Sequence, residues 1–248
     1  MWKLVWSVAV GVVLGLGAVG WWWRAQPPLL DGERGDRRPL VVIDAGHGGV
    51  DGGTQGFGVL EKRVALATAV RAARLLRARG VRTDLTRLSD ATLSLDDRVA
   101  FVNDHEATAL VSVHFNFTTE SPAIRGVEVY YSDPKDLSAQ SAVAAIERVP
   151  VDATAVAAAS VTLADAVRTA VAAHADTPDR GTRNRPDLAL TRRTRCPAIL
   201  VECAYLSNRA DAARASTPAW QDKLAHGIAD GVIAWLETKT QPQGLLNE

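Results

Sequence analysis

The sequence has no excess of charge of either sign. Its 248 residues include 28 basic and 28 acidic side chains, so the formal net charge is zero. Proteins that bind nucleic acid usually carry a basic excess, so the composition gives no support to a nucleic acid as the partner. With 47% hydrophobic residues, the chain can bury a core, and its length fits one globular domain with an appendage.

Cysteine is also scarce, with only Cys196 and Cys203 present. If the residues between them form a strand at about 3.3 Å per residue, the two lie roughly 23 Å apart. A disulfide needs Cα atoms within about 7 Å of each other. We therefore expect both thiols to be unpaired and Cys203 to be buried. There is no CxxC pair to suggest a cysteine-based metal site.

The longest uncharged apolar run is residues 4–23, near the start of the chain. At about 1.5 Å per residue, such a helix spans roughly 30 Å, the thickness of a bilayer core. The tryptophans at 21–23 fit an interfacial belt, which favours an uncleaved membrane anchor. The small residues at 18–20 instead fit the cleavage site of a signal peptide. We expect residues 1–24 to form a hydrophobic helix with one of these roles, and either role exports the chain to the periplasm or cell envelope.

Residues 25–39 mix proline, glycine and charge, which predicts a linker. From residue 40, short apolar runs alternate with longer helical patterns. We expect strands at 40–44, 81–85, 109–113, 126–131, 187–190 and 198–201, and helices at 61–79, 95–105, 154–174 and 218–237. This alternation predicts an α/β domain over 40–238, with one open, mostly parallel twisted sheet and helices on both faces. Residues 239–248 are expected to be a polar tail, and 133–153 a loop or lid.

Four polar residues lie where these elements meet. His47, His114 and Glu202 end or directly follow predicted strands, and Glu61 begins the first predicted helix. The carboxyl ends of parallel strands share one edge of a sheet, where ligands bind. Two imidazoles and one carboxylate make a zinc set with a position left for water, and a further glutamate can move the proton. Together they predict zinc-dependent amide hydrolysis.

Each residue also has a simpler interpretation. A histidine among glycines can cap a turn, a glutamate at a helix start favours the helix dipole, and His114 can be a satisfied strand-end residue. Glu202 is harder to explain in this way, because a carboxylate in an apolar strand is costly unless it is paired or functional. The combination at one sheet edge favours a site. The remaining histidines are expected to be structural or solvated; they are His105, His174 and His226.

Three neighbours have roles that the sequence leaves open. Asp51 is an alternative oxygen ligand. Asp44 either accepts a hydrogen bond from a ligand imidazole or caps a turn, and Asn116 either holds a substrate carbonyl or fixes the loop around His114. The glycine-rich loop does not suggest a nicotinamide enzyme, because the sixth position counted from Gly46 is Asp51, where that fingerprint needs glycine.

In order along the chain, these motifs resemble the zinc-dependent N-acetylmuramoyl-L-alanine amidases of cell separation and cell-wall lysis. The resemblance runs from about residue 40 to 237 and rests on the segments VIDAGHGG (42–49), DGG (51–53), EK (61–62), TR (86–87), SL (94–95) with Arg98, SVHFN (112–116), RGVEVYY (125–131) and PAILVECAYLSN (197–208). It implies that His47, Glu61 and His114 bind one Zn²⁺ and that Glu202 is catalytic.

The resemblance further implies a substrate and partners. The substrate would be peptidoglycan, cleaved between the lactyl group of N-acetylmuramic acid and L-alanine, and a protein activator is a further expected type of partner. Two rival functions are a zinc peptidase that cuts within the stem peptide and a non-catalytic peptidoglycan-binding relative. Residues 133–153 are the segment that could gate the site.

The chain departs from the family pattern at two places. Cys203-Ala204-Tyr205 stands where the family usually has a small residue and then phenylalanine, which we interpret as a packing variation. Phe115 and Phe117 flank Asn116 where smaller residues are common. We expect these two rings to narrow the substrate groove.

Overall fold

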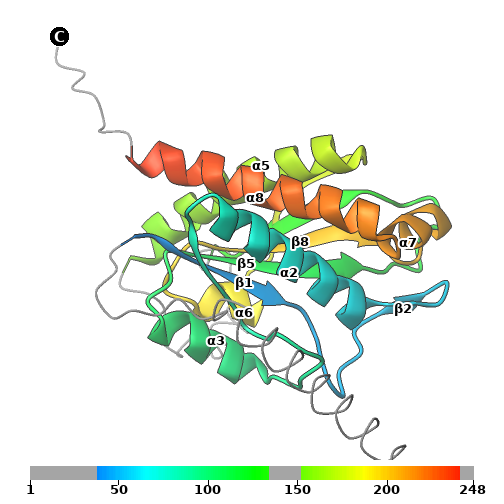
Figure 1. Ribbon diagram of the computed structural model, residues 1–248, viewed down its shortest axis with the longest axis horizontal. Helices are drawn as coiled ribbons and strands as arrows, with labels where there is room; N and C mark the ends of the chain where they lie inside the picture. Colours follow the sequence, from blue (N-terminus) through cyan, green and yellow to red (C-terminus); the bar gives the residue numbers. More distant parts are fainter. Residues whose placement is uncertain (1–37, 134–151, 241–248) are drawn as a thin grey trace, which may run out of the picture. The chain divides into compact units, whose positions relative to one another are not determined.

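The computed structural model describes residues 38–133 and 152–240. Within these residues, the core of the fold is a six-stranded sheet with the strand order β4-β1-β5-β8-β6-β7 (Figure 1). The strands are β1 (Leu40–Ala45), β4 (Arg82–Leu85), β5 (Ala109–Asn116), β6 (Val127–Tyr131), β7 (Asp179–Asn184) and β8 (Ala198–Tyr205). Strands β4, β1, β5 and β8 run parallel, whereas β6 is antiparallel to β8 and parallel to β7. The sheet is mostly parallel, as predicted.

One face of the sheet is covered by three long helices, α2 (Glu61–Ala78), α5 (Ala153–Ala175) and α8 (Pro218–Thr240). The short helix α7 (Arg209–Ala215) leads from β8 into α8. Every second strand residue points into this layer, and the main hydrophobic core includes Ile43, Val111, Val113, Phe115, Val201 and Cys203. Most of the apolar surface of the domain is therefore buried on this side.

Helices α5 and α8 lie unusually close together because glycines line their contact. A Cβ at Gly227 or Gly231 would lie 2.5 Å from the Cα of Val171 or Val167. Among the described helices, α5 alone is long and apolar enough to span a bilayer. Its buried side, which includes Leu163, packs into the core layer with α8, so the fold itself accounts for this apolar composition.

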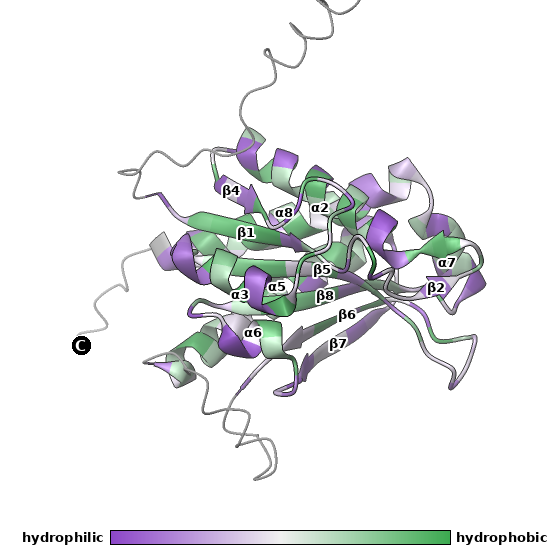
Figure 2. Cartoon of the chain, turned by 90° about the horizontal axis from the view of Figure 1, so that it is seen from below, coloured by the Kyte–Doolittle hydropathy of each residue, from purple (hydrophilic) through white to green (hydrophobic). Residues whose placement is uncertain are grey.

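Among the described residues, α3 (Leu95–Asp104) and α6 (Ala189–Arg193) cover part of the other face (Figure 2). A smaller cluster of buried apolar residues holds these helices; its members are Val42, Val99, Val102, Leu110, Leu190, Cys196 and Ala198. Nearer the carboxyl ends of the strands, the residues that point to this same face are polar. They include Ser112, His114 and Glu202. This polar stretch lies toward the carboxyl ends of the strands. A two-stranded hairpin, β2 (Gln55–Gly56) and β3 (Val59–Leu60), leads from the loop after β1 into α2.

The sequence predictions fail in two places. The expected strand at 187–190 is wrong: the chain there turns into α6, and the edge strand is β7, whose polar residues are ordered by parallel pairing with β6. Strands β5 and β8 also continue beyond their predicted ends, so His114 and Glu202 lie inside strands. The prediction that Cys196 and Cys203 are unpaired is confirmed, since both thiols are free and buried.

Some predictions lie outside the described residues. These are the hydrophobic helix at 1–24, nearly all of the linker at 25–39, the tail from 241 onward and most of the proposed gating segment at 133–153. They remain predictions from the sequence.

Candidate metal centre

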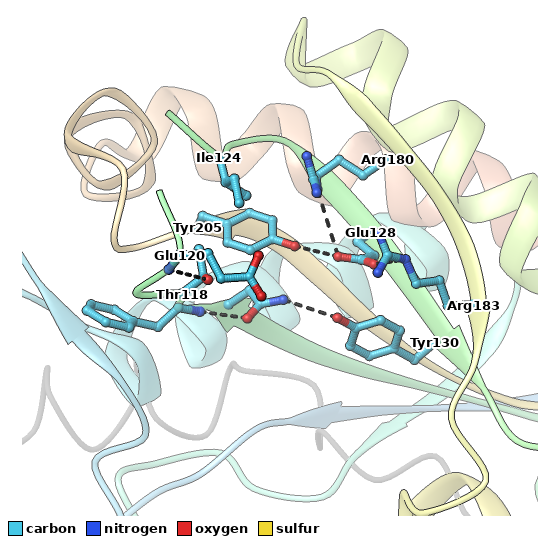
Figure 3. A pocket seen from close by; sticks show the side chains of 10 residues that line it. Thr118, Glu120, Ile124, Glu128, Tyr130, Arg180, Arg183 and Tyr205 are labelled. Carbon is cyan, nitrogen blue, oxygen red and sulfur yellow. Dashed lines mark hydrogen bonds and ion pairs between the residues drawn. The ribbon is translucent and has the colours of Figure 1, made fainter. Parts of the chain in front are cut away.

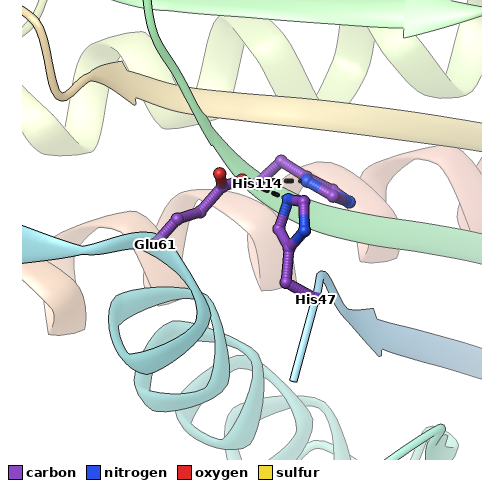
Figure 4. Close-up of side chains that lie close together, drawn as sticks. All are labelled: His47, Glu61 and His114. Atoms are coloured by element: carbon purple, nitrogen blue, oxygen red, sulfur yellow. Dashed lines mark hydrogen bonds and ion pairs between the residues drawn. The ribbon is translucent and has the colours of Figure 1, made fainter. Parts of the chain in front are cut away.

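His47, Glu61 and His114 converge at the carboxyl edge of the sheet, as predicted (Figure 4). Oε1 of Glu61 lies 3.1 Å from Nε2 of His47 and 3.0 Å from Nδ1 of His114. The two imidazoles meet edge to face with their centroids 4.8 Å apart. One ligand atom from each residue lies within 4.8 Å of the others. Two nitrogens and one oxygen therefore face a common point.

The carboxylate of Glu61 is held on both oxygens. Oε1 accepts from the backbone N–H of Phe115 at 3.0 Å, and Oε2 accepts from the N–H and hydroxyl of Thr54 at 2.8 and 3.0 Å. Burial opposes ionisation of Glu61, but the hydrogen bonds from His114 and His47 outweigh it and lower the pKa of the carboxyl well below its ordinary value. The group is ionised at neutral pH, as a metal ligand must be.

His47 is oriented from its other ring nitrogen. Nδ1 lies 2.8 Å from Oδ2 of Asp51, which leaves Nε2 directed at Glu61. The backbone of His47 is left-handed, with φ at 58°, and this turn brings the ring back over the site. Asp51 lies on the far side of the ring from the converging atoms, and the structure does not place it in the cluster that could hold a metal. It is a hydrogen-bond partner that fixes the imidazole.

Two glycines make room for these ligands. A Cβ on Gly46 would lie 2.4 Å from Cε1 of His114. A Cβ on Gly53, whose φ is +66°, would lie 2.6 Å from both Oε2 of Glu61 and Cδ2 of His47. Any side chain at either position would displace a ligand, so this part of the loop is shaped around the three-residue cluster.

Asp44 supports the loop indirectly. Its buried carboxylate accepts from Arg98 at 2.5 Å and from the hydroxyls of Ser112 and Thr86 at 2.6 Å each. Nη2 of Arg98 in turn donates to the carbonyl of His47 at 2.6 Å. Both predicted roles of Asp44 are wrong, because it neither contacts an imidazole nor caps a turn. Its side chain lies on the polar face of the sheet beside Ser112, its register partner in β5.

A second arginine, Arg87, holds the same loop. Its Nε donates to the carbonyl of Ala45 and its Nη2 to that of Gly46, each at 2.8 Å. In the sequence, Arg87 and Arg98 stand out only as parts of the family motifs. Their roles depend on burial beside the loop after β1, and no local pattern reveals that burial.

Glu202 lies beside the cluster on the next strand. In the sheet register it pairs with His114 of β5 and with Glu128 of β6. Its Oε2 is buried and has no hydrogen-bond partner among the described residues. Burial raises the pKa of Glu202 well above its ordinary value, and repulsion from Glu61 and Glu128 adds to this effect. An uncompensated buried carboxyl of this kind is suited to taking up and releasing a proton.

The contacts of Asn116 agree with one of its two predicted roles, and those of Phe115 and Tyr205 correct two interpretations. Nδ2 of Asn116 donates to the hydroxyl of Tyr130 at 3.2 Å, and its Oδ1 accepts from the N–H of Phe117 at 2.7 Å, so Asn116 fixes its own loop. Phe115 is buried in the core on the opposite face, so only Phe117 can narrow a groove. The hydroxyl of Tyr205, which a phenylalanine lacks, donates to Glu128, so this departure is more than a packing variation.

The fold is an α/β domain with a mostly parallel sheet. Two histidines and a glutamate lie at the carboxyl edge of this sheet beside a second glutamate, and this arrangement suits metal-dependent hydrolysis. Comparison with known proteins identifies the family. The sequence profile of the N-acetylmuramoyl-L-alanine amidases matches residues 41–234, and the chain belongs to this family.

Individual relatives agree with this assignment. Over 195 residues, the chain is 32% identical to the amidase LytC of Bacillus subtilis, covering 79% of this chain and 35% of LytC. It is 32% identical to the endolysin of Bacillus phage SPP1, covering 83% of this chain and 69% of that protein. The chain thus spans from about a third to about two thirds of the length of these two relatives.

Solved structures show the same fold. An amidase from Clostridium difficile 630 superposes with a TM-score of 0.69 at 28% identity, covering 82% of this chain and all of that chain. The amidase AmiC2 of Nostoc punctiforme superposes with a TM-score of 0.67 at 35% identity, covering 80% and 97% of the two chains.

Proposed function

We propose that this protein is a zinc-dependent N-acetylmuramoyl-L-alanine amidase that cleaves the amide between the lactyl group of N-acetylmuramic acid and L-alanine in peptidoglycan. The observation that carries the proposal is the convergence of Nε2 of His47, Oε1 of Glu61 and Nδ1 of His114 beside the unpartnered Oε2 of Glu202. Membership of the amidase family gives this chemistry its substrate.

The three converging residues fit zinc. Imidazole nitrogen and carboxylate oxygen are zinc donors, and three protein ligands leave a position for water or substrate. Glu61 is already ionised, and Asp51 sets the ring of His47. Zinc held there would polarise the scissile carbonyl and make water a stronger acid.

The chain's own acid and base is Glu202. As a carboxylate it takes the proton of the attacking water while the new C–O bond forms at the lactyl carbonyl carbon. As a carboxylic acid it returns that proton to the nitrogen of L-alanine while the C–N bond breaks. The products are a lactyl carboxylate on the glycan and a free amine on the peptide. The raised pKa of Glu202 favours the second step, since the carboxyl must hold its proton until the amine departs.

The location of this activity follows from the substrate and the N-terminal segment. We propose that residues 1–24 export the catalytic domain, over residues 40–238, to the cell envelope, with 25–39 as a linker. If residues 4–23 stay uncleaved, the membrane is a second partner. Mass spectrometry of the mature N-terminus separates the two forms: an intact terminus in the membrane fraction supports an anchor, and processing after Gly20 supports a signal peptide. A protein activator stays a prediction from the resemblance.

Digestion of purified peptidoglycan tests the proposed reaction. We expect released peptides that begin with a free L-alanine amine, loss of this release in a chelator, and recovery on adding zinc. New ends within the peptide would show a zinc peptidase instead. Binding to peptidoglycan without any released peptide, with or without zinc, would show a binding protein.

A further inference from the structure

Beside Glu202, the polar face of the sheet continues into a cavity of about 200 Å³ (Figure 3). Strands β6, β7 and β8 and the loop after β5 line it. Glu128, one of its lining residues, is the register partner of Glu202 across β6 and β8. The cavity therefore lies one strand beyond the proposed proton-transfer group, and the proposed chemistry does not use it.

A buried carboxylate, that of Glu128, contacts several of the polar side chains that line the cavity. Glu128 is 1% exposed and receives the hydroxyl hydrogen bond of Tyr205. Arg183 forms an ion pair with Glu128 through Nε, and Nε of Arg180 lies 3.9 Å from Oε2 of Glu128. The guanidinium of Arg180 also lies 5.2 Å from the centre of the Tyr205 ring. Glu128 thus holds Arg183 directly and lies within ion-pair distance of Arg180.

Arg183 is held in place by Glu128 through one of its three guanidinium nitrogens. Its side chain is 56% exposed, and within the described part of the chain only its Nε has a protein partner. Its terminal N–H groups can bind a ligand, and a guanidinium edge matches the two oxygens of a carboxylate. The two arginines outnumber the one buried carboxylate. A second lining carboxylate, Glu120, is exposed, and water screens its charge.

The position of the cavity indicates which part of the substrate reaches it. Glu202 must lie near the departing amine, so the peptide begins on the Glu202 side of the metal centre. The next strand beyond Glu202 in the sheet is β6, followed by β7 with the two arginines. On the substrate, the lactyl carboxyl is consumed in the amide, so the free carboxylates belong to the peptide.

We propose that Arg180 and Arg183, held by Glu128 and Tyr205, bind a carboxylate of the peptide that is released. This inference rests on the proposed amidase function and adds a specificity determinant to it. An acidic stem peptide would be preferred over the same peptide with its carboxylates amidated. Tyr205 acts through Glu128 and is a positioning residue.

Paired substrates test this inference. We compare a soluble N-acetylmuramoyl peptide that has free peptide carboxylates with the same compound fully amidated, using the zinc-loaded full chain. Wild-type protein should prefer the acid form by about tenfold or more in kcat/KM, the scale of a hydrogen bond to a charged group. Arg183→Gln should remove most of this preference through a higher KM for the acid form, with the amidated form unaffected.

Matched variants separate recognition from folding. Arg183→Lys keeps the positive charge beside Glu128 but lacks the paired N–H groups of a guanidinium. This variant should therefore fold and still lose part of the preference for the acid substrate. Tyr205→Phe should weaken the preference less than Arg183→Gln. Arg74→Gln, which removes an exposed arginine of α2, should leave both substrates unchanged. A melting curve for each variant verifies its fold.

Two results would overturn the proposal: equal use of both substrates by wild-type protein, or an equal loss on both substrates in Arg183→Gln and Arg183→Lys. Failure of wild-type protein to cleave either compound would count against the amidase function. Calorimetry with the free acidic peptide then decides the subsite alone. Binding that weakens about tenfold in Arg183→Gln, and by less in Arg183→Lys, supports it, and unchanged or absent binding overturns it.

Discussion

The two faces of the sheet are built from the same strands but differ in chemistry. Along β5, Val111, Val113 and Phe115 point into the helical layer of α2, α5 and α8, whereas Ser112 and His114 point to the other side. One face holds a large and continuous apolar core. The other has a small apolar cluster under α3 and α6 and then a run of polar side chains toward the carboxyl ends of the strands.

The difference shows how the fold supports buried charges near its centre. The apolar face supplies the stability, so the polar face can hold groups that cost free energy, such as the unpartnered Glu202 and the carboxylate of Glu128. If this division is correct, substitutions on the two faces should have separable effects. Polar-face changes should alter the chemistry with little loss of stability, and apolar-face changes should do the reverse.

The largest effect is expected from Glu202→Gln. This change keeps the size of the side chain and removes the proton acceptor, so turnover should fall by about 10²–10⁴. The zinc content and the melting temperature should stay close to wild type, as measured by metal analysis and calorimetry. Loss of zinc in this variant would show that Glu202 is a ligand, which contradicts its assignment as the proton-transfer group.

On the apolar face, Leu224→Ala should act on stability alone. Leu224 is fully buried in α8, and the truncation should cost about 2–5 kcal/mol of unfolding free energy. The value of kcat/KM per folded molecule should stay within about twofold of wild type. The exposed neighbour Lys223→Ala is the control and should change stability by less than about 0.5 kcal/mol in urea titrations. A matching fall in kcat/KM would mean that the two faces are coupled.

A smaller effect is expected where one residue only orients a ligand. Asp51→Ala should weaken zinc binding by about 10–100-fold, because His47 loses the partner of its Nδ1. Turnover at saturating zinc should recover most of its wild-type value. Competition with a fluorescent chelator measures the affinity, and Asp104→Ala at an exposed position is the control. Equal zinc affinities in Asp51→Ala and wild type would show that Asp51 does not contribute to zinc binding.

The smallest predicted effect is a loss of stability at acidic pH. Burial raises the pKa of Asp44, but Arg98 and the hydroxyls of Ser112 and Thr86 outweigh it and lower the folded-state pKa below the ordinary value. This contribution to stability is complete above the unfolded pKa of about 3.9 and is lost as the pH falls through the lower folded value. Urea titrations of metal-free protein should therefore show stability falling below about pH 4. Asp44→Asn should reduce this slope, and an unchanged slope would assign the acid sensitivity to other groups.

Residue type and strand position were enough to predict that three candidate metal ligands converge. His47, Glu61 and His114 are chemically distinctive, and parallel strands bring their carboxyl ends together without any knowledge of packing. The predicted helices at 61–79 and 95–105 also agree with α2 and α3 to within one residue, because apolar periodicity and the glycine after α2 are local signals.

The predictions that failed concern features that depend on strand register or on contacts between distant elements. Strand β7 is polar and becomes a strand only by pairing with β6, so its sequence has no strand signal. The contact of Tyr205 with Glu128 needs the alignment of β6 against β8, and these two strands lie far apart in the sequence, so no local turn fixes their register. The burial of Phe115 was predictable, because its neighbour His114 faces the site and strand residues alternate.

The most direct test of the central claim is anomalous diffraction at the zinc edge from crystals of the zinc-loaded protein. We predict one peak, bound by His47 through Nε2, by Glu61 and by His114 through Nδ1, with Glu202 nearby and uncoordinated. A zinc ion bound by Glu202 or Asp51, or a peak away from this edge of the sheet, would contradict the account.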